Sequence, residues 1–422
     1  MLTTYNEFVL DIPNGRTRVN ALRSQFAERF KTEPEVVVSA PGRTEIIGNH
    51  TDHNNGRVVA AAIQQDTLVV AGPVPQEQPQ DALHLISHGW DREFLVDSRT
   101  DTDSEIHDTE RLMLGLREGL QRHDLPVPGY RACMDSTVLP GSGLSSSAAL
   151  EMALAGVHGA LADTTIPPLG AALAGRYAEN NYLHKPSGLM DQLASALGGM
   201  NALDFADSEA PRIHRIELDF DETNYQVMVV NTGGSHADLT DYYAAVSAEM
   251  HAVARELGVS HLAETGRKQL LAHLTSTRQA TSDRAVLRAF HFFEEQERVS
   301  AFIDAADSRY ILEILELMRE SGDSSIRLLQ NIHTGSPQDQ ALALGIELTR
   351  TYLRQRGAVG AYRVHGGGFA GTMLAVIPAD LAGEYRTAMH RAFGDGSVIP
   401  LHIRQSGMSA ARLPARDRDE QS

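Results

Sequence analysis

The chain has 422 residues, of which 42% are hydrophobic and 22% are charged, values typical of a folded globular protein. This length exceeds what one hydrophobic core usually serves, so we expect two domains. With 37 basic and 55 acidic residues the formal charge is −18, which argues against a general affinity for nucleic acid or for anionic membranes.

Simple features disfavour several further classes of protein. Cys133 is the single cysteine, so neither an intrachain disulfide nor a cysteine-based metal site is expected. The 18 histidines show no HExxH motif or paired Cys/His spacing that would indicate zinc. The N-terminus lacks the pattern of a signal peptide, and no run of 18 apolar residues is present. We therefore expect a soluble, cytoplasmic protein.

In chain order, the apolar spacing predicts alternating helices and strands. Helical periodicity predicts an amphipathic helix over 19–30 and a second clear stripe over 239–257. The remaining predicted elements are strands at 35–42 (ended by Pro41 and Gly42), 57–63, 67–72 and 225–233, helices within 139–163, 168–183 and 187–199, a mostly helical region at 265–357, and a strand–turn–strand at 361–378.

A polar run, GRTEIIGNHTDHNNG at 42–56, lies between apolar segments that resemble strands. Packing alone does not require so many hydrogen-bonding side chains together. The run therefore raises the question of whether it binds a polar ligand.

The segment PGSGLSSSAA (140–149) places Gly141 and Gly143 immediately before a predicted helix. Glycines let backbone N–H groups approach a ligand closely, and a helix N-terminus adds partial positive charge. Together they can bind an anion without a lysine. The segment matches neither the standard P-loop nor the dinucleotide fingerprint, and a serine-capped helix after a flexible turn explains it equally well.

Two further segments are ambiguous when taken singly. AENNYLHKPSGLMDQ (178–192) contains Glu179 and Asp191; the Asp could orient a hydroxyl and accept its proton, and the Glu could hold Mg²⁺. An N-cap Asp and a solvated Glu are the simpler interpretation of each residue alone. HGGGFAG (365–371) predicts a tight hairpin that presses against a nucleotide or against another loop.

As a set, these four segments resemble the galactokinase branch of the GHMP kinase superfamily. Family members carry GRxNxIGEHTDYNxG, which residues 42–56 match, and a glycine–serine motif ending in GLSSSA, matched at 140–148. They also carry GIMDQ, matched by GLMDQ at 188–192, and GGGFGG, matched at 366–371. The resemblance covers nearly the whole chain and the set of motifs is very specific.

The resemblance implies an α/β (α+β) fold of two lobes, with mixed sheets and packed helices and the active site between them. We expect an N-terminal GHMP kinase domain at 1–212, with the sugar loop, the phosphate loop and the catalytic Asp, and a C-terminal domain at 213–422. The implied activity is ATP-dependent phosphorylation of the anomeric hydroxyl of a hexose, D-galactose first, with Mg²⁺. Sugar and ATP are the expected partners, with no nucleic acid or membrane, and the chain is expected to be a monomer or a weak homo-oligomer.

The resemblance also assigns roles to residues. It places ATP at the loop formed by Gly141, Ser142, Gly143, Leu144, Ser145, Ser146, Ser147 and Ala148, and Mg²⁺ at Ser146, Ser147 and Glu179. Asp191 would face the anomeric hydroxyl as base or orienting group, beside Arg43. An adjacent arginine keeps the pKa of an Asp low, which favours orientation over strong general-base behaviour. Phosphoryl transfer needs in-line placement and charge stabilisation above all, so these groups suffice.

The resemblance answers the question raised by the polar run, since every buried hydroxyl of a hexose needs a partner. His50, Asp52 and Tyr243 match sugar-contacting residues of the family. Glu45 and Asn49 belong to the same expected socket but have traded places, because the family has Asn at the first position and Glu, which contacts the far hydroxymethyl end of the sugar, at the second.

Two accounts of this exchange remain open. Either Glu45 restores the carboxylate from a neighbouring position, or the pocket prefers another sugar, such as an N-acetylhexosamine, arabinose or galacturonate. His53, Ser187 and Ala370 also depart from the family pattern, and Lys185, six residues before Asp191, is a candidate for phosphate contact. A third alternative, a sugar- and ATP-sensing protein without turnover, is disfavoured because GLSSSAA and Asp191 are intact.

Overall fold

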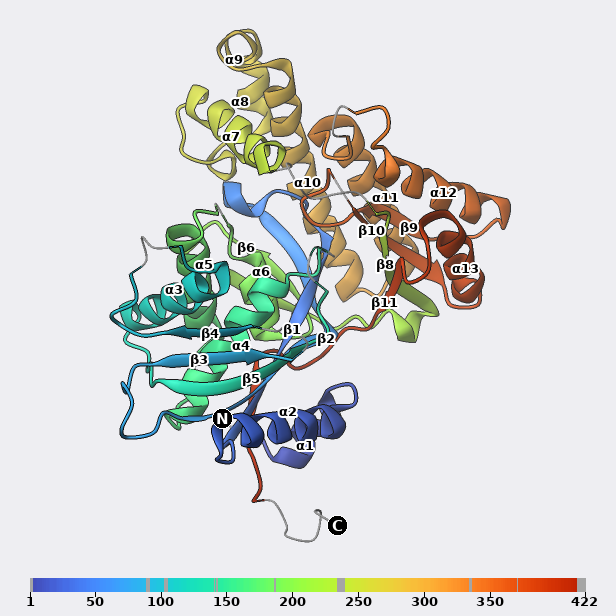
Figure 1. The fold of residues 1–422 in the computed structure, drawn as a ribbon. Coiled ribbons are helices and arrows are strands. Elements are labelled where there is room, and N and C mark those ends of the chain that lie inside the picture. Colours follow the sequence, from blue (N-terminus) through green and yellow to red (C-terminus); the bar gives the residue numbers. More distant parts are fainter. Residues whose placement is uncertain are drawn as a thin grey trace.

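The computed structural model describes residues 3–88, 92–101, 105–139, 141, 143–185, 187–233, 240–333, 336–369 and 371–415. Two lobes, each built on a β-sheet with helices packed against it, stand side by side (Figure 1). In this part of the chain, no helix combines the length and the apolar character needed to cross a membrane.

The first lobe contains a mixed eight-stranded sheet. Its strands are β1 (Val36–Ile47), β2 (Arg57–Pro73), β3 (Leu83–Ser87), β4 (Glu93–Val96), β5 (Tyr130–Ser136), β6 (Met200–Asp204), β7 (Arg212–Ile216) and β12 (Ser409–Arg412). The order is β12-β1-β2-β5-β3-β4, with β6 paired to β2 and β7 to β6, and the β3–β5 pair alone is parallel. The long strand β2 therefore pairs with β6 through its first half and with β5 through its second.

The alternation of side chains along β1 explains how this sheet is covered on both faces. Val37 packs under α1 (Tyr5–Asp11) and α2 (Gly15–Phe30), whereas Val36 and Val38 face a cluster built largely from helices on the other side. Those helices are α3 (Asp108–Arg122), α4 (Ser146–Leu161), α5 (Pro168–Tyr182) and α6 (Met190–Leu197). Because both faces are covered, β1 and β2 are buried along most of their length, whereas the edge strands β4 and β7 have exposed residues.

The second lobe contains an antiparallel sheet of order β11-β8-β10-β9. Its strands are β8 (Tyr225–Asn231), β9 (Ala361–Val364), β10 (Thr372–Pro378) and β11 (Val398–Leu401). One face packs on α12 (Ala341–Gln355) and α13 (Ala382–Phe393), and the other on α10 (Asp283–Asp307) and α11 (Ile311–Ser324). A helical group, α7 (Thr240–Glu256), α8 (Arg267–Ala272) and α9 (Leu274–Ala280), packs on α10 (Figure 1).

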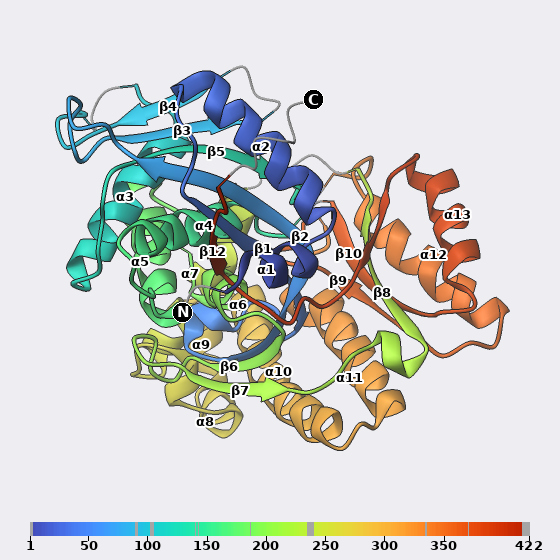
Figure 2. The ribbon, with the colours of Figure 1, turned by 90° about the horizontal axis from the view of Figure 1, so that it is seen from below.

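The structure differs from the sequence expectations in two respects. Pro41 and Gly42 do not end the first strand, because β1 passes through them with a register shift and continues to Ile47. The expected strands at 57–63 and 67–72 are one strand, β2. Near and after the proposed domain boundary at 212–213, β7 and the returning β12 both pair within the first sheet, as Figure 2 shows for β12 beside β1.

A buried ion pair joins the lobes beneath the polar run. Arg363 of β9 donates to the Glu45 carboxylate of β1 at 2.7 Å and also to the backbone carbonyls of Glu45 and Ile46. The two side chains are 0% and 3% exposed. Asn49 completes the link by donating to Glu45 and to the Gly366 carbonyl at 2.6 Å. The polar run is thus fixed to the second sheet.

We expect Arg363→Met to destabilise the protein by about 3–5 kcal/mol, because the buried Glu45 carboxylate would lose its charged partner. The midpoint of urea unfolding measures this loss. Arg350→Met is the matched control, since the Arg350–Glu347 pair is 51% and 53% exposed and should contribute less than about 1 kcal/mol. Similar losses in both variants would contradict this role of Arg363.

Candidate active site

A cavity of about 540 Å³ lies where the two lobes face each other. Its walls come from β1, the loop before α4, the segments around α5 and α6, α7, and the turn between β9 and β10. Of the individual residues singled out from the sequence, those that line it are Arg43, His50, Asp52, His53, Gly141, Gly143, Leu144, Ser145, Ser146, Ser147, Glu179, Lys185, Ser187, Asp191 and Tyr243.

Arg43 and Asp191 form the centre of this cavity. The guanidinium donates two parallel hydrogen bonds to the carboxylate, from Nε to Oδ1 at 2.7 Å and from Nη2 to Oδ2 at 2.8 Å. Its third nitrogen donates to the Gly143 carbonyl at 2.5 Å. Burial opposes the ionised form of Asp191, but the charge and hydrogen bonds of Arg43 outweigh it and lower the Asp191 pKa. Asp191 is therefore a carboxylate at neutral pH.

The loop before α4 has the geometry of an anion site. Gly141 and Gly143 have φ angles of 73° and 72°, in the left-handed region that glycine adopts without strain. Ser145 precedes the helix without capping it, because its hydroxyl donates instead to Asp191 at 2.5 Å. The first N–H groups of α4 thus have no side-chain cap from Ser145 and face the cavity side of the loop, where an anion would be favoured.

A cluster of oxygen ligands lies beside this loop. The Ser147 hydroxyl donates to Oε1 of Glu179 at 3.0 Å, and Lys185 Nζ donates to the same oxygen at 2.6 Å. Gln192 donates to Glu179 and to Glu151 behind it. Burial and then the charge of Glu179 raise the pKa of Glu151 well above its usual range. Ser146 lines the cavity next to Ser147.

This cluster fits Mg²⁺ shared with a nucleotide. Its donors are oxygens, as Mg²⁺ requires, and the described residues contain no group of three or more His, Cys, Asp or Glu able to hold a metal ion by themselves. A metal here would need phosphate oxygens to complete its coordination, which is how Mg²⁺ is bound in many kinases.

The opposite end of the cavity carries polar groups from the 48–56 loop and α7. His50, at φ 58°, donates from Nε2 to the Gly367 carbonyl at 2.9 Å. Tyr243 donates to the Gly368 carbonyl at 2.9 Å. Gly188 passes so close to Asp52 that any Cβ at position 188 would collide with the carboxylate. A side chain at position 188 would therefore have to displace the Asp52 carboxylate.

The surroundings of Asp52 disfavour the charged form of its side chain. Burial, and then the negative charge of Asp191, raise its pKa to about 6. A carboxylate kept in such a position gains most when a ligand supplies hydroxyl donors.

Glu45 and Asn49, expected in the sugar socket, are not among the described residues that line this cavity. They are 2% and 0% exposed, and their side chains are taken up by the contacts with Arg363 and Gly366 and, for Asn49, by a hydrogen bond from Asn331 at 2.8 Å. The exchange of the two residues therefore sits in the contact between the lobes. Ala148 is likewise buried, within α4, and Ser142 lies outside the described residues.

Sequence reasoning missed His365 and Gln192, which also line the cavity. His365 is 2% exposed and contacts the Thr44 hydroxyl through Nε2 at 3.0 Å. Gln192 follows Asp191 in a motif already singled out, so its position was a usable signal. His365 likewise opens the HGGGFAG segment singled out from the sequence, so its position was also a usable signal.

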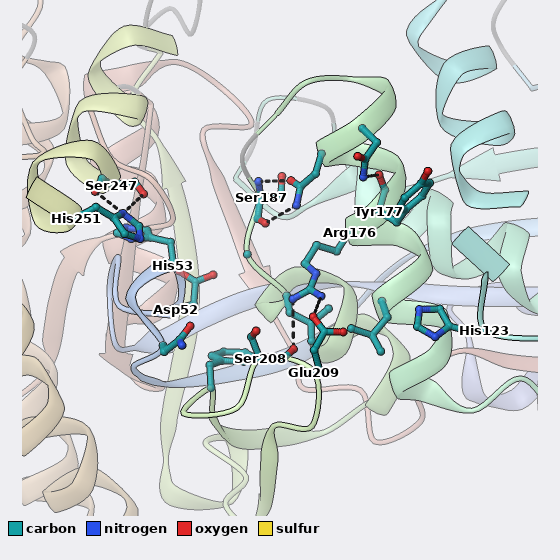
Figure 3. A pocket seen from close by; sticks show the side chains of 17 residues that line it. Asp52, His53, His123, Arg176, Tyr177, Ser187, Ser208, Glu209, Ser247 and His251 are labelled. Atoms are coloured by element: carbon teal, nitrogen blue, oxygen red, sulfur yellow. Dashed lines mark hydrogen bonds and ion pairs between the residues drawn. The ribbon is translucent and has the colours of Figure 1, made fainter. Parts of the chain in front are cut away.

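A second cavity of about 510 Å³ adjoins the first and shares five lining residues with it: Asp52, His53, Ser187, Gly188 and Ser247. Figure 3 shows Asp52, His53 and His251 on one side and Tyr177 and His123 on the other. Arg176 lies between them and donates hydrogen bonds to the Glu209 carboxylate and to the Ser208 carbonyl. The two cavities are thus neighbours that share the Asp52 side chain as part of their walls.

Two family signatures match the chain. The galactokinase galactose-binding signature covers residues 24–73, and the N-terminal domain of GHMP kinases covers residues 111–199. The galactokinase of Mycobacterium tuberculosis (strain ATCC 25177 / H37Ra) is 31% identical over 359 residues, which is 85% of this chain and 93% of that protein. The galactokinase of Mycobacterium bovis (strain BCG / Pasteur 1173P2) matches to the same extent.

Solved structures share the fold. The crystal structure of Lactococcus lactis galactokinase complexed with galactose superposes with a TM-score of 0.79 at 23% identity, covering 93% of this chain and 99% of that one. Methanococcus jannaschii mevalonate kinase gives a TM-score of 0.61 at 12% identity, covering 87% and 98%. The two-lobed fold expected from the motifs is confirmed. With the sequence relatives at 31% identity, the chain belongs to the galactokinase family of GHMP kinases and is a sugar kinase.

Proposed function

We propose that this kinase transfers the γ-phosphoryl group of ATP to the anomeric hydroxyl of D-galactose, giving galactose 1-phosphate. The observation that carries the proposal is the paired contact of Arg43 with Asp191 and with the Gly143 carbonyl, which places a carboxylate at the phosphate loop. The relatives named galactokinase and the galactose-binding signature support the choice of sugar.

In the proposed reaction, Asp191 orients the attacking hydroxyl and receives its proton as the bond to phosphorus forms. Because Arg43 keeps Asp191 ionised with a low pKa, orientation is its larger contribution. Arg43 lies where negative charge builds up on the transferring group, and the N-terminus of α4 offers further donors. Such a transfer needs placement and charge stabilisation more than a strong base.

The proposed nucleotide site is the loop at 141–147. Ser147 and Glu179, with Ser146 beside them, would hold Mg²⁺ together with phosphate oxygens. When bound, Mg²⁺ neutralises phosphate charge.

At the acceptor end, Asp52 is placed to accept from two adjacent ring hydroxyls, with His50 and Tyr243 near the same sugar. A site whose buried acceptors are satisfied only by hydroxyls discriminates strongly against analogues that lack them. Asp52 has a raised pKa that hydroxyl donors would relieve, which suits this role.

A second acceptor class is favoured by the neighbouring cavity and by the burial of Asn49. Asn49, at the position of the family's carboxylate for the far end of the sugar, is not among the lining residues, and a second cavity of about 510 Å³ shares Asp52 with the first. A hexose with a larger polar substituent, such as an N-acetylhexosamine, therefore has room.

An ADP-release assay over a panel of sugars tests both candidates. We expect turnover with galactose and the highest kcat/KM for it. A higher kcat/KM for an N-acetylhexosamine would select the second class. If calorimetry showed binding of ATP and sugar while no sugar released ADP, a sensing role would replace the kinase.

Asp191→Asn should lower kcat by about 10²–10³-fold and leave the sugar Kd within a few-fold, since the amide keeps the size of the carboxylate but loses its charge. Stopped-flow kinetics and calorimetry measure the two quantities. Asp307→Asn, a surface change in an exposed pair with His214, is the control and should leave kcat unchanged. Unchanged kcat in Asp191→Asn would remove Asp191 from the chemistry.

The kcat/KM for the sugar should fall as the pH drops below about 6. With a raised pKa of about 6, Asp52 is a carboxylate above this pH and accepts hydroxyl protons, whereas below it the protonated acid loses acceptor capacity. Burial lowers the pKa of His50, so its protonation belongs to more acidic solutions. A flat profile between pH 7 and 5, in protein shown to be folded by circular dichroism, would contradict this assignment.

A further inference from the structure

The contacts of Glu179 include one mobile cation, Lys185. Nζ of Lys185 and the hydroxyl of Ser147 both donate to Oε1 of Glu179, at 2.6 Å and 3.0 Å. One carboxylate oxygen of Glu179 thus accepts two hydrogen bonds, one from Lys185 and one from Ser147 in the first turn of α4.

The two partners of this ion pair differ in freedom. The Glu179 side chain is 3% exposed and its other oxygen is fixed by Gln192, so the carboxylate cannot follow a ligand. The Lys185 side chain is 56% exposed and holds the carboxylate by a single hydrogen bond. An exposed lysine loses little when it leaves such a pair, because water solvates the ammonium again.

Lys185 is also the cation that this cavity can offer to a phosphate. Among the described residues that line the cavity, Arg43 and Lys185 carry permanent positive charge. Arg43 is already committed to Asp191 and to the Gly143 carbonyl. Lys185 lines the same cavity as the loop at 141–147, and its Nζ shares Oε1 of Glu179 with the Ser147 hydroxyl of that loop.

The choice of lysine at this position is itself informative. The chain contains 34 arginines and three lysines, Lys31, Lys185 and Lys268. A guanidinium would bind Glu179 through two parallel hydrogen bonds, whereas an ammonium is a compact point charge on a flexible stem. A lysine can therefore change partners where an arginine would stay.

We propose that Lys185 is an exchangeable counter-ion: it neutralises Glu179 in the nucleotide-free enzyme and moves to phosphate oxygens of ATP when Glu179 becomes a metal ligand. This inference rests on the proposed metal and nucleotide positions. A metal ion and an ammonium cannot share one carboxylate oxygen without strong repulsion, and the incoming phosphates supply the charge that the lysine needs. Lys185 therefore makes free metal bind weakly and couples metal binding to nucleotide binding.

The test compares Lys185→Met with the wild type in two measurements. Electron paramagnetic resonance gives the Mn²⁺ affinity of the nucleotide-free protein, and steady-state kinetics gives the KM for ATP. Without its competitor, Mn²⁺ should bind about tenfold more tightly, and loss of a charge-assisted contact should raise the KM for ATP by about tenfold. Lys185→Arg should weaken Mn²⁺ binding, because the guanidinium stays on Glu179.

Lys268→Met, on an exposed position of α8, is the matched control and should change neither quantity. An unchanged or weaker Mn²⁺ affinity in Lys185→Met would overturn the proposal, as would an unchanged KM for ATP. A merely structural lysine cannot produce tighter metal binding together with weaker nucleotide binding. If the wild type phosphorylated no sugar, the proposed function would fail, while the Mn²⁺ measurement would still decide the role of Lys185.

Discussion

The proposed active site depends on the ion pair between Arg43 and Asp191. Arg43 comes from the first strand of the sheet, Asp191 from the start of α6, and the same guanidinium donates to the Gly143 carbonyl of the loop at 141–147. Arg43 is 6% exposed, so loss of this partner would leave a buried charge unpaired. The pair therefore joins three distant segments. In the proposed reaction, a carboxylate stabilised in this way would orient a hydroxyl better than it would remove a proton.

A second buried pair determines how the two lobes meet. Glu45 and Arg363 close the contact between the sheets, and Asn49 ties the loop that carries His50 and Asp52 to the Gly366 carbonyl. The loop can present Asp52 to the cavity because its neighbours are anchored behind it. The polar side chains of this run therefore have two roles. His50 and Asp52 face the cavity, whereas Glu45 and Asn49 hold the lobes together.

The resemblance of the four motifs, taken as a set, to one family predicted the two-lobed fold and the meeting of these motifs, whereas each motif taken singly was ambiguous. It did not predict which side chains of the polar run face the cavity. Glu45 lies on β1, and its partner Arg363 is more than 300 residues away, so no local pattern reveals the pair. The continuation of β1 through Pro41 and Gly42 was missed for a similar reason: pairing with β2 along its whole length outweighs the local tendency of these residues to end a strand. The return of β12 to the first sheet is also a long-range event.

We propose that the loop at 141–147, Asp191 and Asp52 together bind one sugar and one nucleotide in a single cavity. A crystal structure of the protein with galactose and a non-hydrolysable ATP analogue tests it most directly. We expect the anomeric oxygen to lie between Asp191 and the terminal phosphate, and Asp52 to accept hydrogen bonds from ring hydroxyls. A sugar bound in the neighbouring cavity without contact to Asp191, or phosphates placed away from the loop at 141–147, would contradict it.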